Sequence, residues 1–448
     1  MAKDKTVYIC QNCEAAHSKW AGQCNSCGQW NTLVETVVKA KKSSLSSLSG
    51  NRSSGVAATI KLTQVKTTSG AKGRIKTKIG EFDRVLGGGI VPGSVVLVGG
   101  EPGIGKSTLL TQLAINTSSV KQNVLYVCGE ESPEQVKMRV ERLVGKKVGA
   151  GILLLPETDV DSIITTIESI PEIGLVIVDS IQTISTTDLT GMAGSVGQVR
   201  ESSQRLLQAG KKHGIPVFLV GHVTKSGTLA GPKVLEHLVD AVLDLTGERT
   251  GAYRILRASK NRFGATDEVG VFSMSDKGME EVANPSAAFL EESQTGTPGS
   301  AVVAIMEGTR PVLVEIQALV INSQLAIPRR VSNGISINKV QLLTAVLQKR
   351  CGLVGLGTSD IFVNVAGGIH IKEPAADIGI ALAIASSLKN QSLPVKLAVI
   401  GEIGLLGEIR QVSFLNKRVA EAKKLGFSQV VAPNKYKNLN QVVKRLFS

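Results

Sequence analysis

The sequence Gly100-Glu101-Pro102-Gly103-Ile104-Gly105-Lys106-Ser107 separates the apolar run Val95–Val98 from a second run, Thr108–Ala114. It matches the pattern G-x4-G-K-[ST] in the context that this pattern requires, between a buried strand and a helix. The glycines let backbone amides wrap around phosphates, and the N-terminus of the following helix adds its positive end. We therefore predict a nucleotide site that extends to Thr108, in which Lys106 pairs with the β- and γ-phosphates and Ser107 ligates Mg²⁺.

Two acidic positions follow other apolar runs of the same region. Asp179 ends the run Leu175–Val178 and is expected to contact the Mg²⁺ through water. The next residue is a serine, so a general base must come from elsewhere. Glu130 follows the run Val124–Cys128, at the edge where such a sheet collects its active-site loops, and is the predicted base. Glu131 is the competing candidate, and both acids have a structural alternative as residues favoured at a helix start.

The surrounding sequence alternates short apolar runs with helical patterns. The runs predict buried parallel strands at Val95–Val98, Val124–Cys128, Leu175–Val178, Val217–Val220 and Ala241–Leu245. Ser132-Pro133-Glu134-Gln135 is a capping box with proline at the first helical position, so it predicts a helix start. The fold class predicted for residues 66–283 is an α/β domain, an open sheet with crossover helices.

A second α/β unit is predicted at residues 301–448. It follows a polar segment, residues 284–300, whose prolines and glycines indicate a linker. Its strands are expected at Ala301–Met306, Val312–Val320, Ile361–Val365 and Leu397–Ile400. Its helices are expected at Asn338–Lys349, Asp377–Leu388 and Leu415–Leu425.

Four of the six cysteines crowd into the first 30 residues with the spacing Cys10-x2-Cys13-x10-Cys24-x2-Cys27. Two thiolate pairs on two short knuckles suit tetrahedral zinc, and a redox pair is the alternative. A module of residues 1–34 cannot build enough core alone, so bound metal would supply its folding energy. The following residues, 35–65, are rich in serine and lysine and predict a flexible linker.

Composition excludes several classes of protein. The 448 residues, 42% of them hydrophobic, exceed what one core usually serves and exclude a mostly disordered chain. We find no apolar run of the ~20 residues that a membrane span needs and no secretory signal, so a cytoplasmic protein without a membrane partner is expected. The net charge of +14 is concentrated in residues 1–80 and 411–448. Such basic ends recruit nucleic-acid phosphates, although lysines also merely solubilise tails.

Two cations stand close together in Lys260-Asn261-Arg262-Phe263-Gly264, which follows the predicted strand Tyr253–Ala258. Residues two apart on a strand share a face. Lys260 and Arg262 are therefore placed to reach the nucleotide of a neighbouring subunit as trans-acting fingers. The alternative is that Arg262 only anchors a loop by hydrogen bonds.

A polar segment, Gly221–Lys225, follows the predicted strand Val217–Val220. Its position favours His222 or Thr224 as a sensor of the γ-phosphate, with Lys225 and the following glycine-rich loop contacting DNA. A polar loop without a role in binding is the alternative for each of these residues.

The four-cysteine ribbon, the phosphate loop and the Lys260–Gly264 segment together resemble the bacterial RadA (Sms) family of DNA repair proteins along essentially the whole chain. The resemblance implies a RecA-like core in which Glu130 is the catalytic glutamate and Lys260 and Arg262 act across a subunit interface. It implies a DNA-dependent ATPase that uses ATP, Mg²⁺ and Zn²⁺ and forms a homo-hexameric ring. It also implies binding of single-stranded DNA and branched recombination intermediates, branch migration, and work alongside a RecA-type recombinase.

The C-terminal unit resembles the domain of Lon proteases but lacks the residues of their chemistry. Lon-type proteolysis needs a serine nucleophile and a lysine base close together. Asp377 stands at the serine position and Asn416 at the lysine position, and Lys417 would point about 100° away on a helix. We predict a scaffold and DNA-binding role instead. The competing functions are an ATP-dependent protease and an ATP-switched clamp that does not move along DNA.

Overall fold

The computed structural model describes residues 5–10, 15–38, 73–119, 122–145, 151–221, 235–247, 253–291, 293 and 295–447. The chain forms two compact units. The first consists of Met1–Leu245, Arg257–Thr266 and Ser275–Met279, and the second of Thr246–Leu256, Asp267–Met274 and Glu280–Ser448. Within the described ranges, no helix combines the length and apolar character that crossing a bilayer requires.

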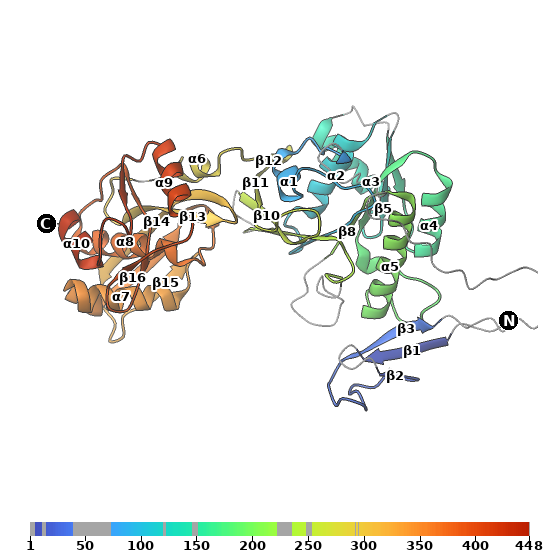
Figure 1. Cartoon of the computed structure of the whole chain (residues 1–448), viewed down its shortest axis with the longest axis horizontal. Helices are drawn as coiled ribbons and strands as arrows, with labels where there is room; N and C mark the ends of the chain where they lie inside the picture. The colour runs from blue at the N-terminus through green and yellow to red at the C-terminus, as the bar shows by residue number, and fades with distance from the viewer. Residues whose placement is uncertain are drawn as a thin grey trace, which may run out of the picture. The chain divides into compact units, whose positions relative to one another are not determined.

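The first unit begins with a three-stranded antiparallel sheet (Figure 1). Its strands are β1 (Lys5–Cys10), β2 (Ala16–His17) and β3 (Leu33–Val38), in the order β2-β1-β3. The expected end of the cysteine module at residue 34 falls inside β3, and Glu35 on this strand accepts hydrogen bonds from the backbone N–H (3.2 Å) and hydroxyl (2.7 Å) of Thr190. A side chain of the ribbon therefore contacts the segment that precedes α5.

A parallel sheet forms the centre of the first unit. Its strands are β4 (Val95–Gly100), β5 (Asn123–Cys128), β6 (Ile152–Leu155), β7 (Ile173–Asp179), β8 (Val217–Val220) and β9 (Ala241–Thr246). They lie in the order β9-β4-β8-β7-β5-β6 and pair in parallel, and β10 (Tyr253–Asn261) lies next to β9. The predicted open α/β sheet is confirmed, with β6 as a strand that the apolar runs did not indicate.

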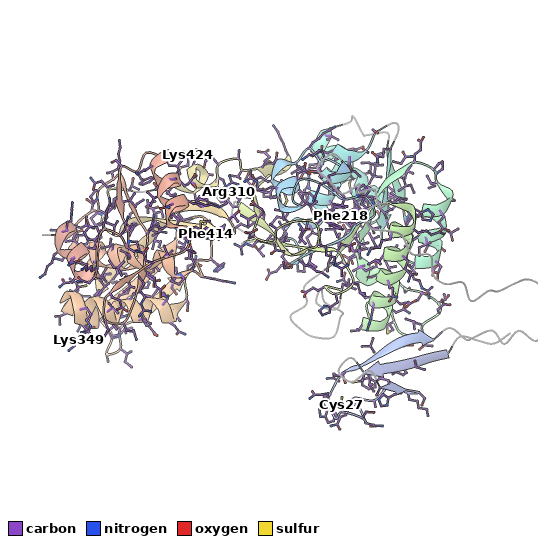
Figure 2. The ribbon with its side chains drawn as sticks, viewed as in Figure 1. Cys27, Phe218, Arg310, Lys349, Phe414 and Lys424 are labelled. Carbon is purple, nitrogen blue, oxygen red and sulfur yellow. The ribbon has the colours of Figure 1, made fainter. Side chains whose placement is uncertain are left out.

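Helices cover both faces of this sheet (Figure 1). They are α1 (Gly80–Val85), α2 (Lys106–Thr117), α3 (Pro133–Val144), α4 (Val160–Ser169) and α5 (Val196–His213). Helices α4 and α5 pack their apolar residues on one face, whereas Phe82 of α1 meets Phe218 on the other face with ring centroids 6.0 Å apart (Figure 2). The predicted capping box is confirmed, because Ser132 and Gln135 exchange two hydrogen bonds at the start of α3.

The second unit is built on a six-stranded sheet with the order β15-β16-β14-β13-β17-β20. These strands are β13 (Ser300–Glu307), β14 (Arg310–Asn322), β15 (Arg330–Asn333), β16 (Ser359–Val365), β17 (Leu397–Val399) and β20 (Gln429–Val431). Two-residue strands form a separate hairpin, β18 (Glu402–Ile403) with β19 (Ile409–Arg410). Strands β11 (Val269–Ser275) and β12 (Gly278–Glu281) precede this sheet in the chain.

The helices of the second unit are α6 (Pro285–Leu290), α7 (Ile337–Cys351), α8 (Asp377–Lys389), α9 (Leu415–Lys424) and α10 (Leu439–Phe447). Helices α7, α8 and α10 share one apolar cluster with the sheet, and α9 belongs to a second cluster that includes Val302 and Leu313. The segment expected as a linker, residues 284–300, contains α6. Helix α8 is buried along almost its whole length, and its first residue, Asp377, is buried with it.

Candidate functional site

The predicted phosphate loop lies at the carboxyl end of β4 and continues into α2. Gly103 and Gly105 have φ values of +79° and +111°, where a glycine is needed to avoid strain. The Lys106 side chain is buried, and its Nζ donates to the carbonyl oxygens of Gly100 (2.9 Å) and Glu101 (3.0 Å). The ammonium is thus held at the loop. The other residues of the predicted site belong to the same turn and the first turn of α2: Pro102, Ile104, Ser107 and Thr108.

Asp179, the last residue of β7, lies beside this loop. Its carboxylate accepts hydrogen bonds from the hydroxyl of Ser107 and, at 2.8 Å, from that of Tyr126. Burial raises the pKa of Asp179, and these two hydrogen bonds oppose the rise. Burial also lowers the pKa of Lys106, against the charges of Asp179 and Glu130. A hydroxyl and a carboxylate together beside an ammonium are a donor set that fits Mg²⁺ and phosphate.

Tyr126 is a site residue that sequence reasoning missed. It lies on β5, it is almost completely buried, and its hydroxyl orients the Asp179 carboxylate. The available signal was a phenolic hydroxyl within an apolar strand, since a buried tyrosine hydroxyl usually finds a polar partner. That Tyr126 lies beside Asp179 becomes clear only from the pairing of β5 with β7.

The two neighbouring glutamates have different partners. Ser180 donates a hydrogen bond from its hydroxyl to Glu130 Oε1, and the backbone N–H of Glu130 donates to the Asp179 carbonyl at 3.1 Å. Glu131 instead forms an ion pair with Arg139 on α3. The charges of both glutamates act on Asp179, but only that of Glu130 is also found to act on Lys106, whereas Glu131 is paired with Arg139.

Lys260 and Arg262 contact the segment that leads into β9. Lys260 Nζ donates to the carbonyl oxygens of Glu236 (2.5 Å) and Val239 (2.9 Å). Arg262 Nη1 donates to Asp240 Oδ1 at 3.0 Å, and the Arg262 side chain is half exposed. Within one chain, both cations therefore have the loop-anchoring contacts that the alternative interpretation of Arg262 describes.

These cations lie far from the phosphate loop of their own chain. Asp240, the partner of Arg262, accepts a hydrogen bond from the backbone N–H of Val95, at the start of β4. The loop begins at Gly100, five residues further along this strand, or about 17 Å at ~3.3 Å per residue. The structure thus separates Lys260 and Arg262 from the cluster of Lys106, Ser107, Asp179 and Glu130. A contact of either cation with nucleotide requires the nucleotide of another chain.

Three of the four predicted zinc ligands meet in the ribbon. Figure 2 labels one of them, Cys27. The Sγ atoms of Cys10, Cys24 and Cys27 all lie within 4.8 Å of one another, and those of Cys10 and Cys27 are 3.6 Å apart. Tetrahedral zinc with Zn–S bonds of ~2.3 Å requires sulfurs about 3.8 Å apart, so the cluster fits this ion. Cys13 lies outside the described residues, as do His222, Thr224 and Lys225. His17 Nε2 is 3.4 Å from Cys24 Sγ, so this histidine borders the cluster.

Replacing Cys27 with serine is expected to remove one Zn²⁺ per chain and to leave the ATPase core folded. The cluster supplies most of the ribbon's core, whereas the sheet of β4–β9 has its own buried residues. Metal analysis of protein purified with reductant measures the ion, and thermal unfolding measures the core. Zinc-free wild-type protein, or global unfolding of the Cys27→Ser variant, would contradict this assignment.

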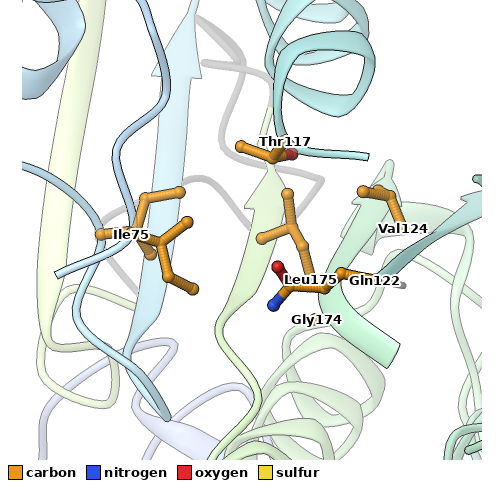
Figure 3. A pocket seen from close by; sticks show the side chains of 7 residues that line it. Ile75, Thr117, Gln122, Val124, Gly174 and Leu175 are labelled. Atoms are coloured by element: carbon orange, nitrogen blue, oxygen red, sulfur yellow. The ribbon is translucent and has the colours of Figure 1, made fainter. Parts of the chain in front are cut away.

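A small cavity in the first unit does not qualify as a ligand site (Figure 3). Its walls include Ile75, Ile90, Val124 and Leu175, and its volume is about 10 Å³. That is roughly the space needed for one water molecule. This cavity therefore has no room for a ligand larger than a water molecule.

In the second unit, the position expected to correspond to the Lon serine holds a buried acid. Asp377, at the start of α8, accepts hydrogen bonds at Oδ2 from Lys339 Nζ (3.0 Å) and Ile403 N (3.3 Å). Burial raises the pKa of Asp377, and the Lys339 charge opposes the rise. Asn416 is exposed on α9, and the ammonium of Lys417 lies 5.2 Å from the centroid of the Phe414 ring.

The parallel sheet, the phosphate loop and the acids at its edge define a P-loop ATPase with a RecA-like core. Comparison with protein families gives a match for each of the three parts of the chain. Residues 65–228 match a family described as AAA domain, residues 8–35 the rubredoxin metal binding domain, and residues 339–436 subunit ChlI of Mg-chelatase. The chain is thus an ATPase with an N-terminal zinc ribbon and a C-terminal α/β domain.

The chain belongs to the RadA family of DNA repair proteins. It is 51% identical over 437 residues to "DNA repair protein RadA" of Halalkalibacterium halodurans, an alignment that covers 97% of this chain and 94% of the relative. It is 47% identical to the protein of the same name from Bacillus subtilis, over 97% of this chain and 93% of the relative. Among solved structures, a RadB recombinase aligns with 46% of this chain and 99% of its own, at 23% identity and a TM-score of 0.37.

Proposed function

We propose that this chain is a DNA-dependent ATPase of recombinational DNA repair that works in the cytoplasm as a homo-hexameric ring. It binds single-stranded DNA and drives branch migration of recombination intermediates. The observation that carries the proposal is the separation of Lys260 and Arg262 from the phosphate loop of their own chain. In one chain the phosphate loop lies at the carboxyl end of β4, and Lys260 and Arg262 lie near its amino end. In a ring, the two cations of each chain can reach the phosphate loop of the neighbouring chain.

Each residue of the nucleotide cluster has a defined role in this proposal. Lys106 binds the β- and γ-phosphates, while Ser107 and Asp179 hold Mg²⁺, which neutralises charge on the phosphates. Glu130 takes a proton from the attacking water, and the hydroxyl of Ser180 orients its carboxylate. Tyr126 is a positioning residue, because it acts through Asp179.

Two observations support binding of DNA: the positive net charge of the chain and the names of its relatives. The chain carries a net charge of +14, concentrated at its two ends, and its relatives are named DNA repair proteins. Contacts between lysines or arginines and phosphates release counterions, so the affinity for single-stranded DNA should fall steeply with salt. The proposed substrate is a branched intermediate made by a RecA-type recombinase. On such a substrate the protein can bind a single strand and move the branch point.

The proposal is tested by ATP turnover with and without single-stranded DNA over a range of protein concentrations. Turnover per chain should rise with concentration as rings form, and DNA should stimulate it further. Turnover that is independent of both would contradict completion of the site by a neighbour.

Replacing Glu130 with glutamine is expected to lower ATP turnover about 10²- to 10⁴-fold, because the amide cannot accept the proton of water. ATP binding should persist, since Lys106 is unchanged. The matched control is Glu131→Gln, which loses the ion pair with Arg139 and should keep turnover near the wild-type value. The reverse ranking of the two variants would make Glu131 the base.

A proteolytic function is the weaker candidate. The buried Asp377 and its ion pair with Lys339 occupy the position where the Lon comparison requires a serine. Incubation of the full chain with casein, ATP and Mg²⁺ should leave the casein intact. Degradation that stops in an Asp377→Asn variant would favour a protease.

A further inference from the structure

The segment that carries Lys260 and Arg262 packs against a turn that is distant from it in the sequence. We call residues 260–264 the finger segment and residues 87–89, three glycines that follow α1, the glycine turn. Both belong to the first unit. A Cβ atom on Gly264 would lie 3.2 Å from Gly87 Cα, closer than the ~3.5–4.0 Å of an ordinary carbon–carbon contact. The two backbones therefore meet with no room for a side chain between them.

The side chain of Arg74 connects these two elements. Its Nη2 donates to the Phe263 carbonyl oxygen at 2.6 Å. Its Nη1 donates to the carbonyl oxygens of Leu86 (2.8 Å) and Gly89 (3.3 Å). The guanidinium is a planar fork with donors on separate nitrogens, so it can bind two backbones at once in a fixed geometry. Arg74 therefore joins the finger segment to the glycine turn.

The side chain of Asn261 makes a second connection. Its Nδ2 donates to the Val85 carbonyl oxygen (3.3 Å) at the end of α1, and its Oδ1 accepts a hydrogen bond from the Phe263 backbone N–H (2.9 Å). The backbone N–H of Arg262 donates to the Asp240 carbonyl oxygen at 3.0 Å. The backbone is thus held on both sides of Arg262, whereas the Arg262 side chain is half exposed.

A fixed backbone is useful for a cation that must meet charge in a transition state. Preorganised charges need no reorganisation at the moment of reaction, and a misplacement of about 1 Å can lower a rate ~10²-fold. We propose that Arg74 is a positioning residue of ATP hydrolysis, which fixes the finger segment so that Arg262 reaches the nucleotide of the neighbouring chain. This inference rests on the trans role proposed above. Arg74 itself acts through the Phe263 carbonyl and needs no contact with nucleotide.

The alternative is that Arg74 only stabilises the end of α1. Leu86 is the C-cap of this helix, and the last carbonyl oxygens of a helix need donors from outside it. Loss of a local cap would lower the free energy of unfolding and leave the rate of the folded protein unchanged. The hydrogen bond to Phe263, 189 residues further along the chain, has no part in such a cap.

The first measurement is single-turnover hydrolysis by the full chain in excess over ATP, which resolves slow rates. Arg74→Ala should lower the rate about 10- to 100-fold. Equilibrium binding of ATP should not change, because the phosphate loop is intact. Arg74→Lys keeps a cationic donor and should retain more of the rate than alanine does. The matched control is Lys76→Ala, which removes a hydrogen bond of 2.6 Å to the Gly88 carbonyl of the same turn and should keep the wild-type rate.

A double variant shows whether Arg74 acts through Arg262. If it does, Arg74→Ala combined with Arg262→Ala should hydrolyse ATP no more slowly than Arg262→Ala alone, because the group that Arg74 positions is already missing. Two losses that multiply would mean that Arg74 acts independently of Arg262. This comparison is valid whether Arg262 serves its own nucleotide or that of a neighbour.

Mixed rings test the direction of the effect. Subunits with Arg74→Ala keep an intact phosphate loop and carry a misplaced finger. Mixing them with Lys106→Ala subunits should raise ATP turnover above the sum of the two separate proteins, whereas mixing them with Arg262→Ala subunits should not. Thermal unfolding verifies that each variant is folded. Asn261→Ala removes the second connection and should give the same pattern, so it replaces Arg74→Ala if that protein is unstable.

The outcomes separate this inference from the proposed function. A wild-type rate in folded Arg74→Ala protein, or losses that multiply in the double variant, would overturn the role of Arg74 and leave the trans role of Arg262 intact. Failure of Arg262→Ala and Lys106→Ala subunits to restore activity to each other would refute the trans role itself.

Discussion

Lys106→Ala is expected to lower ATP turnover more than about 100-fold, the size of effect seen when a preorganised charge is removed from a transition state. The ammonium is buried at the phosphate loop, held by two carbonyl oxygens and flanked by the charges of Asp179 and Glu130. Alanine removes the positive charge that is placed to neutralise the β- and γ-phosphates. Release of inorganic phosphate measures the change.

The fold and much of the DNA binding should survive this substitution. Lys106 contacts the loop and not the apolar core, so the free energy of unfolding should change little. The matched control is Lys137→Ala, an exposed lysine on the neighbouring helix α3, which should keep wild-type turnover. Wild-type turnover by the folded Lys106→Ala protein would disprove the assignment of the phosphate loop.

Arg262→Ala is expected to bind ATP but to hydrolyse it about 10³- to 10⁵-fold more slowly, the range known for arginine fingers. A cation delivered by closure of an interface stabilises the charge that spreads over the transferred phosphoryl group. The chain itself should stay folded, because the Arg262 side chain is half exposed and exposed ion pairs contribute little. Lys211, whose Nζ is 3.4 Å from Asp240 Oδ1, still neutralises that acid.

Mixing separates action in trans from local anchoring. Subunits with Arg262→Ala keep an intact phosphate loop, and subunits with Lys106→Ala keep an intact finger. Some interfaces of mixed rings therefore combine both, and ATPase activity should partly return. If Arg262 only anchors the Asp240 segment, ATPase activity should not return at any ratio of the two variants. A flat curve from subunits that are verified to co-assemble would refute the trans role.

Local signals were enough to predict much of the first unit. Strands β4, β5, β7, β8 and β9 are short apolar runs that are mostly buried, so their composition alone identifies them, whereas the half-buried β6 was missed. The Ser132 capping box and the glycines of residues 100–107 each encode a backbone conformation within a few residues. Features of this kind require no knowledge of the rest of the chain.

Contacts between distant residues were not predictable in the same way. The hydrogen bond from Tyr126 to Asp179 depends on the pairing of two strands, and the ion pair of Glu131 depends on the path of α3. The sequence placed Lys260 and Arg262 on one face of a strand, but it did not indicate their distance from the phosphate loop. That distance follows from Asp240 lying at the amino end of β4.

The second unit shows the same limit. Its long apolar strands and helices were expected, whereas β15, β20 and α10 were not, because short or strongly amphipathic segments carry weak signals. The substitution at the Lon serine position was visible in the sequence. The ion pair of Asp377 with Lys339 joins α8 to α7, so it depends on how these two helices pack.

The most direct test of the proposed motor is displacement of a labelled strand from a three-strand branched DNA, measured together with ATP turnover in the same reaction. The proposal predicts that displacement requires ATP, scales with turnover and disappears in Lys106→Ala. ATP turnover that DNA stimulates without any displacement, on tailed and three-strand substrates alike, would contradict a motor and favour an ATP-switched clamp.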